Sequence, residues 1–106
     1  ICVSGYTATV RPPASYTDAL KRQQMASQGL PGPTSLYEED HRVPLEVGGN
    51  PTSPQNLWPE PWDGPHGAHA KDTIENRVHK DVCSGTLTLA QGQAVFLGDW
   101  WTALVP

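Results

Sequence analysis

Asp40 and His41 stand side by side at the end of a segment with the pattern of a strand, and Asn56 follows 15 positions after the histidine. A histidine can take a proton from water near neutral pH. A carboxylate can hold a hard divalent cation, and an asparagine can fix a histidine ring by hydrogen bonding. Together these residue types suit metal-assisted hydrolysis with His41 as the general base.

A second group of polar residues lies around a predicted helix start. His66 and His69 follow His41 by 25 and 28 positions, and His69 is the favoured further metal ligand because the first helical turn can direct it back toward Asp40. Asp72 shares its helix face and could assist or replace it. Lys71 could contact a phosphate as a point charge.

Each of these residues also has an ordinary structural interpretation. The Asp40-His41 pair could simply end a strand, Asn56 could cap a loop, and His69 could be a solvated helix residue. Glu38 lies two positions before Asp40, so strand alternation directs both side chains to one face. Glu38 is therefore expected to be a supporting or structural carboxylate.

Proline and glycine divide the chain into short elements. Ser15 to Asp18 and Thr88 to Gln91 have the form of capping boxes. Trp58 and Trp62 are expected to pack in the core or in loops rather than to stack on bases. The patterns predict an extended segment at 1–14, helices over 18–27, 68–83 and 88–104, and strands over 36–45 and 54–59.

The composition describes one small, loop-rich domain over residues 1–106. The chain has 11 prolines and 10 glycines, and 37% of its residues are hydrophobic. It contains no apolar run near the roughly 20 residues that would span a bilayer, so no membrane segment is expected. The formal net charge is −4 with seven Lys and Arg residues. This balance argues against tight non-specific binding to DNA, which calls for a basic surface.

The two cysteines, Cys2 and Cys83, belong to no zinc-binding cluster. A disulfide between them is predicted, and it favours an extracytoplasmic location. Two buried free thiols in a cytoplasmic protein are the alternative. The chain begins at Ile1 rather than at a methionine, as expected if an upstream segment such as a signal peptide has been removed.

Four short motifs resemble those of the HNH nucleases: Asp40-His41, Pro44-Leu45, Gly48-Gly49 and Asn56-Leu57. The resemblance covers about residues 36–83. It implies an α+β fold with a ββα-metal centre and flanking helices. It also implies that His41 is the general base, that Asp40 is a metal ligand, and that Asn56 orients the base. A further helix residue, here His69, would complete the metal site.

The predicted function is that of a metal-dependent endonuclease acting on DNA, with RNA as an alternative substrate. A carboxylate-rich site without thiolates favours Mg²⁺, while histidine ligation would also accept Mn²⁺, Ni²⁺ or Zn²⁺. Two other functions stay open. One is a catalytically degenerate HNH-fold module that binds metal or nucleic acid, and the other is a secreted interaction protein.

Overall fold

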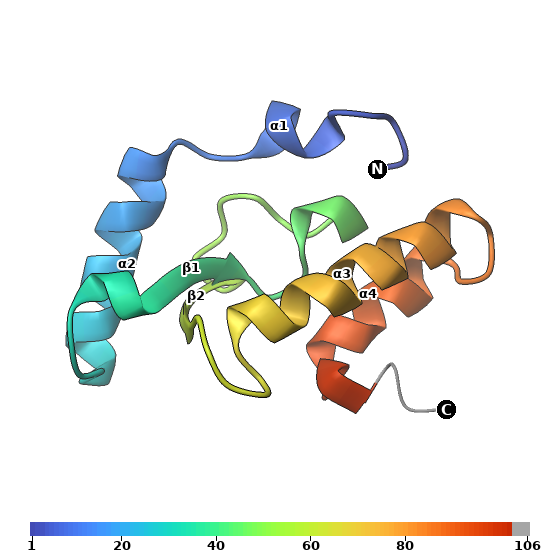
Figure 1. The fold of residues 1–106 in the computed structure, drawn as a ribbon. Helices are drawn as coiled ribbons and strands as arrows, with labels where there is room; N and C mark the ends of the chain where they lie inside the picture. Colours follow the sequence, from blue (N-terminus) through green and yellow to red (C-terminus); the bar gives the residue numbers. More distant parts are fainter. Residues whose placement is uncertain (103–106) are drawn as a thin grey trace.

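A two-stranded antiparallel hairpin lies at the centre of the computed structural model, which describes residues 1–102 (Figure 1). Strand β1 spans Tyr37–His41 and strand β2 spans Leu57–Pro61. In the register, Asp40 is opposite Trp58 and His41 is opposite Leu57. With the four α-helices of the described residues, the hairpin forms an α+β domain, which confirms the predicted fold class at this level.

The two predicted strands were placed correctly in order but not in length. β1 ends at His41 rather than at residue 45, because the chain turns there into the short 3-10 helix η2, Leu45–Val47. Pro44 stands directly before η2 in an extended conformation and cannot donate to a ladder. β2 begins three residues later than the predicted 54–59 strand.

Helix α3 spans Ala68–Cys83, as the apolar spacing predicted. Helix α4 spans Leu89–Leu97 and has the predicted capping box between Thr88 and Gln91. It is shorter than the predicted 88–104 helix because the chain becomes extended at Gly98 and then forms the 3-10 helix η3, Trp100–Thr102. Residues 103 and 104 of that prediction lie outside the described residues.

The N-terminal prediction needs two corrections. Residues 1–14 are not all extended, since Tyr6–Val10 form the short helix α1. Helix α2, Ala14–Gln28, begins four residues earlier than predicted, with Pro13 at its N-cap. The Ser15–Asp18 pattern is therefore inside the helix and is not its cap. Proline is well suited to a helix start because it has no N–H to leave unpaired.

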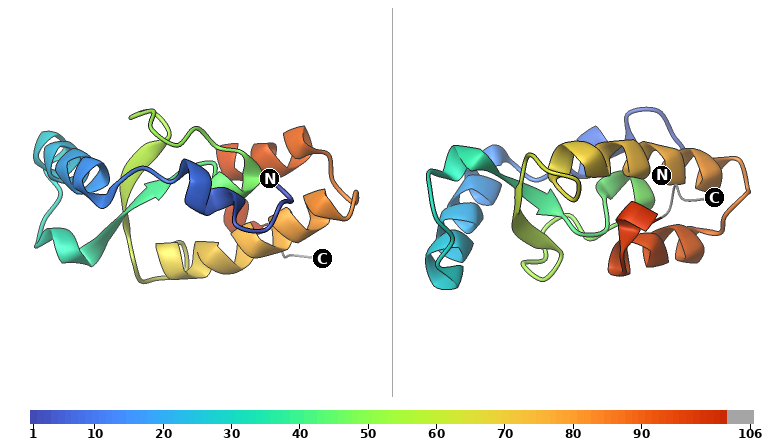
Figure 2. Two further views of the ribbon diagram at one scale, coloured as in Figure 1. Left: turned by 90° about the horizontal axis from the view of Figure 1, so that it is seen from above. Right: turned by 60° about the horizontal axis from the view of Figure 1, so that its bottom comes forward.

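The largest apolar cluster joins η2, α3, α4 and η3, while α2 packs on the hairpin from the other end of the molecule (Figure 2). Trp100 is buried in this cluster at 7% exposure, whereas Trp58 is 41% exposed. The expectation that Trp58 packs in the core is therefore wrong. The cluster is formed by Val43, Val47, Ile74, Val78, Phe96 and Trp100.

A disulfide joins Cys2 to Cys83, as predicted, and so ties the N-terminus to the end of α3. The ring Nε2 of His79 lies 3.1 Å from the carbonyl oxygen of Ile1 and adds a second contact at the same place. These links hold α1 near η2 (Figure 1). Among residues 1–102 there is no helix with the length and apolar character needed to cross a membrane.

Candidate functional site

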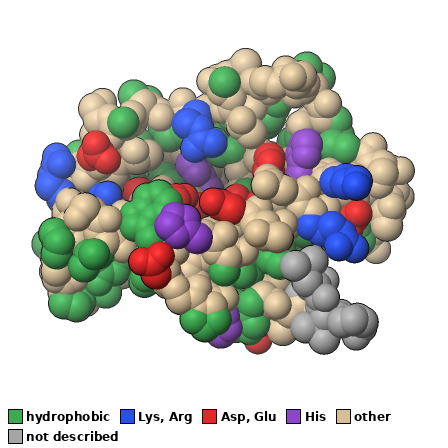
Figure 3. Space-filling model, in the orientation of Figure 1, with side chains coloured by type: hydrophobic (Ala, Val, Ile, Leu, Met, Phe, Trp, Pro, Cys, Tyr) green, Lys and Arg blue, Asp and Glu red, His purple; other side chains and the backbone are tan. Residues whose placement is uncertain are grey.

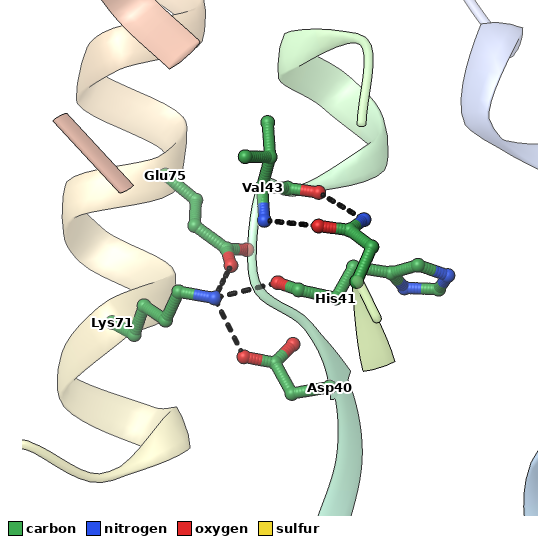
Figure 4. Close-up of polar contacts among 6 residues, drawn as sticks. Asp40, His41, Val43, Lys71 and Glu75 are labelled. Carbon is green, nitrogen blue, oxygen red and sulfur yellow. Dashed lines mark hydrogen bonds and ion pairs between the residues drawn. The ribbon is translucent and has the colours of Figure 1, made fainter. Parts of the chain in front are cut away.

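Strand alternation sends the neighbouring residues Asp40 and His41 to opposite sides of β1. Figure 4 shows the Asp40 carboxylate directed toward α3 and the His41 ring directed away from that helix. Glu38 shares the face of Asp40, as predicted, and it pairs in register with Glu60 of β2. The side of the hairpin that faces α3 therefore carries three carboxyl groups.

Lys71 supplies the positive charge at this face. Its Nζ lies 2.8 Å from Asp40 Oδ2, 2.7 Å from the backbone oxygen of His41 and 3.3 Å from Glu75 Oε2 (Figure 4). The side chain is 2% exposed. Two of these contacts are hydrogen bonds, and the third, with Glu75, is an ion pair. The Lys71 ammonium is thus directed into the protein, away from the phosphate that was its predicted partner.

More carboxylates converge here than Lys71 can neutralise. Burial, together with the charge and hydrogen bond of Asp40, raises the pKa of Glu60 to about 9 and that of Glu38 to about 8. Burial likewise raises the pKa of Glu75 to about 8. Burial also disfavours the charged form of Asp40, but hydrogen bonds from Glu60 and the charge of Lys71 outweigh it, so the pKa of Asp40 is lowered.

A shared proton explains how Glu60 can touch Asp40. Glu60 is 1% exposed, and no N–H or O–H group within residues 1–102 donates to either of its carboxyl oxygens. Two carboxyl groups can be hydrogen-bonded only when one of them carries a proton. The raised pKa assigns that proton to Glu60, which donates to the ionised Asp40. The cluster thus holds protons at neutral pH in place of further cations.

His41 is fixed by the backbone on its own side of the strand. Its Nε2 lies 2.9 Å from the carbonyl oxygen of Pro51, and the residue is 6% exposed. A carbonyl only accepts, so Nε2 carries the hydrogen and Nδ1 of the neutral ring keeps its lone pair. Burial lowers the pKa of His41 despite the Pro51 hydrogen bond and the Asp40 charge. The ring is therefore neutral at pH 7 and can act as a base.

Asn56 holds the loop that supplies this carbonyl. Its Oδ1 accepts from the backbone N–H of Val43 at 2.9 Å, and its Nδ2 donates to the oxygens of Val43 at 3.1 Å and Asn50 at 2.9 Å. Gly49 lies so close that an added Cβ would come within 1.7 Å of the Val43 oxygen. None of the Asn56 hydrogen bonds goes to the His41 ring, so Asn56 orients His41 indirectly, through the loop that ends at Pro51.

A polar cleft of about 230 Å³ opens beside β1 and beneath α1. Figure 3 shows acidic side chains gathered in this hollow, with a basic side chain at its upper edge. Arg11, just after α1, is the only Lys or Arg among the lining residues, and its side chain enters no ion pair or hydrogen bond within residues 1–102. The titratable groups of the lining are Arg11, Glu38, Glu39, Asp40, His41, Glu46, Asp72 and Glu75.

The two histidines expected near a metal lie elsewhere. His69 Nδ1 is 3.3 Å from Asp63, its side chain is 64% exposed, and its ring packs against Trp62. His66 stacks on Trp101 with ring centroids 3.8 Å apart. Neither histidine lines the acidic cleft. From the first turns of α3, Asp72 lines the cleft and Lys71 reaches Asp40.

Sequence reasoning missed five contributors to the site: Arg11, Glu39, Glu46, Glu60 and Glu75. The sequence carried a weak signal for Glu60. It lies two positions after Trp58, so strand alternation places both side chains on the same face of the second strand. Glu75 lies four positions after Lys71, the spacing of an intrahelical ion pair, and that contact exists at 3.3 Å. Arg11 had no local signal, because the disulfide and the path of α1 bring it to the cleft.

Within residues 1–102, no three His, Cys, Asp or Glu side chains are already arranged to hold a metal ion. The donor set nevertheless suits a hard dication, since the cleft offers carboxylate oxygens with little positive charge to balance them. Comparison of the chain with protein-family models, with curated proteins and with solved structures found no match.

Proposed function

We propose that this chain is an HNH-type, metal-dependent endonuclease that hydrolyses phosphodiester bonds in DNA, with RNA as an alternative substrate. The observation that carries the proposal is the state of His41. A buried, neutral histidine with Nε2 bound to a carbonyl and Nδ1 free lies beside a carboxylate cleft. The element order, a hairpin followed by a helix, is also that of a ββα-metal centre.

In this reaction His41 Nδ1 accepts a proton from the attacking water. The water oxygen forms a bond to phosphorus, the bond from phosphorus to the leaving oxygen breaks, and the leaving oxygen takes a proton from solvent. Arg11 is the residue positioned to bind the phosphate, because it lies at the same cleft and its guanidinium has no partner among the described residues. Pro51 and Asn56 keep the histidine in the correct tautomer.

Asp40, Asp72 and the neighbouring glutamates would hold the divalent cation, with Mg²⁺ as the first candidate. Such a cation supplies charge stabilisation for the phosphate and the leaving oxygen. The fit rests on the protonated carboxyls of Glu38 and Glu75, which line the cleft, because a site that retains protons near pH 8 can exchange them for a metal. Metal binding should therefore strengthen as the pH rises.

A second function is favoured by one contact. Lys71 Nζ already pairs with Asp40 Oδ2 at 2.8 Å, so an ammonium group neutralises the carboxylate that would bind the metal. This contact favours a catalytically degenerate module in which the cluster is a remnant. A secreted interaction protein is the third candidate. The Cys2–Cys83 disulfide is compatible with an extracytoplasmic location, which is the location that we propose.

The test incubates supercoiled plasmid and single-stranded RNA with the purified, disulfide-bonded protein in Mg²⁺ or Mn²⁺, with an EDTA control. Cleavage that requires metal and falls at least about 100-fold in His41→Ala supports the nuclease. His69→Ala is the matched control, since the His69 side chain is 64% exposed and does not line the cleft. If the protein does not cleave and its thermal stability is unchanged in added Mg²⁺ or Mn²⁺, the nuclease proposal is wrong. The degenerate module and the interaction protein then remain as candidates.

A further inference from the structure

A second cleft, of about 520 Å³, shares no lining residue with the acidic cleft. It lies between β2 and the chain from the end of α4 into η3, two segments that Figure 2 shows near one another at the underside of the molecule. Its volume falls within the range of small-molecule sites. Nothing in the proposed hydrolysis uses it.

Two tryptophans give this cleft an aromatic wall. Trp58 is 41% exposed and Trp101 is 38% exposed, although both are large apolar side chains. The Trp101 ring is held in place by His66, stacked at 3.8 Å with an interplanar angle of 15°, and by Trp100, whose ring meets it edge-on at 5.5 Å. An exposed indole ring that is already fixed, as that of Trp101 is, offers stacking surface at little entropic cost.

Polar groups are placed at the floor and the rim. Glu60 lies at the floor, 1% exposed, and neither of its oxygens accepts an N–H or O–H hydrogen bond from the described residues. These buried oxygens can accept a hydrogen bond from an N–H group of a ligand. At the rim, Arg42 makes only a long contact of 3.4 Å from Nη2 to the oxygen of Leu97. Its guanidinium is therefore available to an anion.

We propose that this second cleft binds one nucleotide unit of a single-stranded nucleic acid, with its base on Trp58 and Trp101, a base N–H on Glu60 and a phosphate on Arg42. The choice of a nucleotide rests on the proposed function, while the planar shape, the N–H donor and the anionic group follow from the cleft. Every base can stack on an aromatic side chain, so the cleft would bind a single strand without sequence specificity.

The proposal is tested by titrating ¹⁵N-labelled protein with AMP and with adenosine in EDTA while the four indole N–H signals are followed by NMR. The Trp58 and Trp101 signals should shift with both ligands, and that of Trp62 should not. Trp58→Ala should weaken AMP binding by about tenfold or more. Trp62→Ala is the matched control and should leave it unchanged.

Arg42→Gln should weaken the binding of AMP but not of adenosine, because only AMP has the phosphate. Absence of shifts with AMP, or equal losses in the two tryptophan variants, would overturn the proposal. If an aromatic or basic peptide shifts these indole signals and AMP does not, the nucleotide proposal is wrong and the cleft binds a protein partner instead. All titrations are done in EDTA, so AMP binding is measured independently of metal-dependent cleavage. If the protein binds AMP but does not cleave nucleic acid, only the nuclease proposal is refuted. If it cleaves but does not bind AMP, only this site is refuted.

Discussion

Lys71→Met should destabilise the protein more than any other substitution of a lysine in this chain. Methionine keeps most of the volume of the side chain but removes the charge that contacts Asp40, Glu75 and the backbone oxygen of His41. The side chain is 2% exposed, so water cannot replace the lost ammonium without entering the core. The substitution therefore leaves the buried, ionised Asp40 without its cation.

Removal of one partner from a buried ion pair costs about 3–5 kcal/mol. In a domain near 100 residues, each kcal/mol lowers Tm by about 4–8 °C. The expected fall in Tm at pH 7 is therefore between about 12 and 40 °C. Thermal unfolding followed by circular dichroism measures it. Lys80→Met is the matched control, because Lys80 lies on the same helix but is exposed, and it should change Tm by only a few degrees.

The pH dependence gives this prediction a second, independent readout. The carboxyls of Glu38, Glu60 and Glu75 lose their protons near pH 4.5 when the chain is unfolded, but near pH 8 to 9 in the folded state. Between these values the folded protein binds more protons. Its free energy of unfolding therefore falls as the pH rises, by about 1.4 kcal/mol per pH unit for each proton retained. Asp40 has the opposite sign and loses its contribution only in acid.

Without Lys71 the same carboxyls hold their protons more tightly, so this slope should become steeper. Lys71→Met should recover much of its lost stability at pH 5.5 and be least stable relative to wild type at pH 8.5. A fall in Tm of less than about 5 °C at pH 7 would refute the argument that Lys71 neutralises the cluster. A large fall that is the same at pH 5.5 and pH 8.5 would refute the electrostatic cause and indicate lost packing instead.

Three further results are expected. Asn56→Ala removes three hydrogen bonds from the loop and should lower the free energy of unfolding by about 2–4 kcal/mol in urea denaturation, and a change below 0.5 kcal/mol would contradict its role as the loop anchor. Reduction of the Cys2–Cys83 disulfide should destabilise the protein by roughly 4–5 kcal/mol, and a Tm that reductant does not change would show that the bridge is absent in solution. Asp72→Asn should weaken Mg²⁺ binding by about tenfold in calorimetry while His69→Ala does not, and the reverse outcome would return the helix ligand to His69, as the sequence predicted.

The sequence alone determined the features that depend on neighbouring residues. The bounds of α3 follow from apolar residues spaced along one helix face, and the start of α4 follows from the Thr88–Gln91 capping box. The order of hairpin and helix, and the shared face of Glu38 and Asp40, follow from turn residues and strand alternation. The cysteine pairing followed because the described chain contains no other cysteine.

Only the tertiary structure decided which of these residues meet. Lys71 and His69 are two positions apart, so a helix turns one toward Asp40 and the other toward solvent, and no local pattern fixes the rotation of α3 against the hairpin. Glu60 joins Asp40 through strand register, and Arg11 reaches the cleft because a distant disulfide holds α1 there. Burial then sets the charge of each group, since pKa depends on the solvent and the charges that folding removes or brings near.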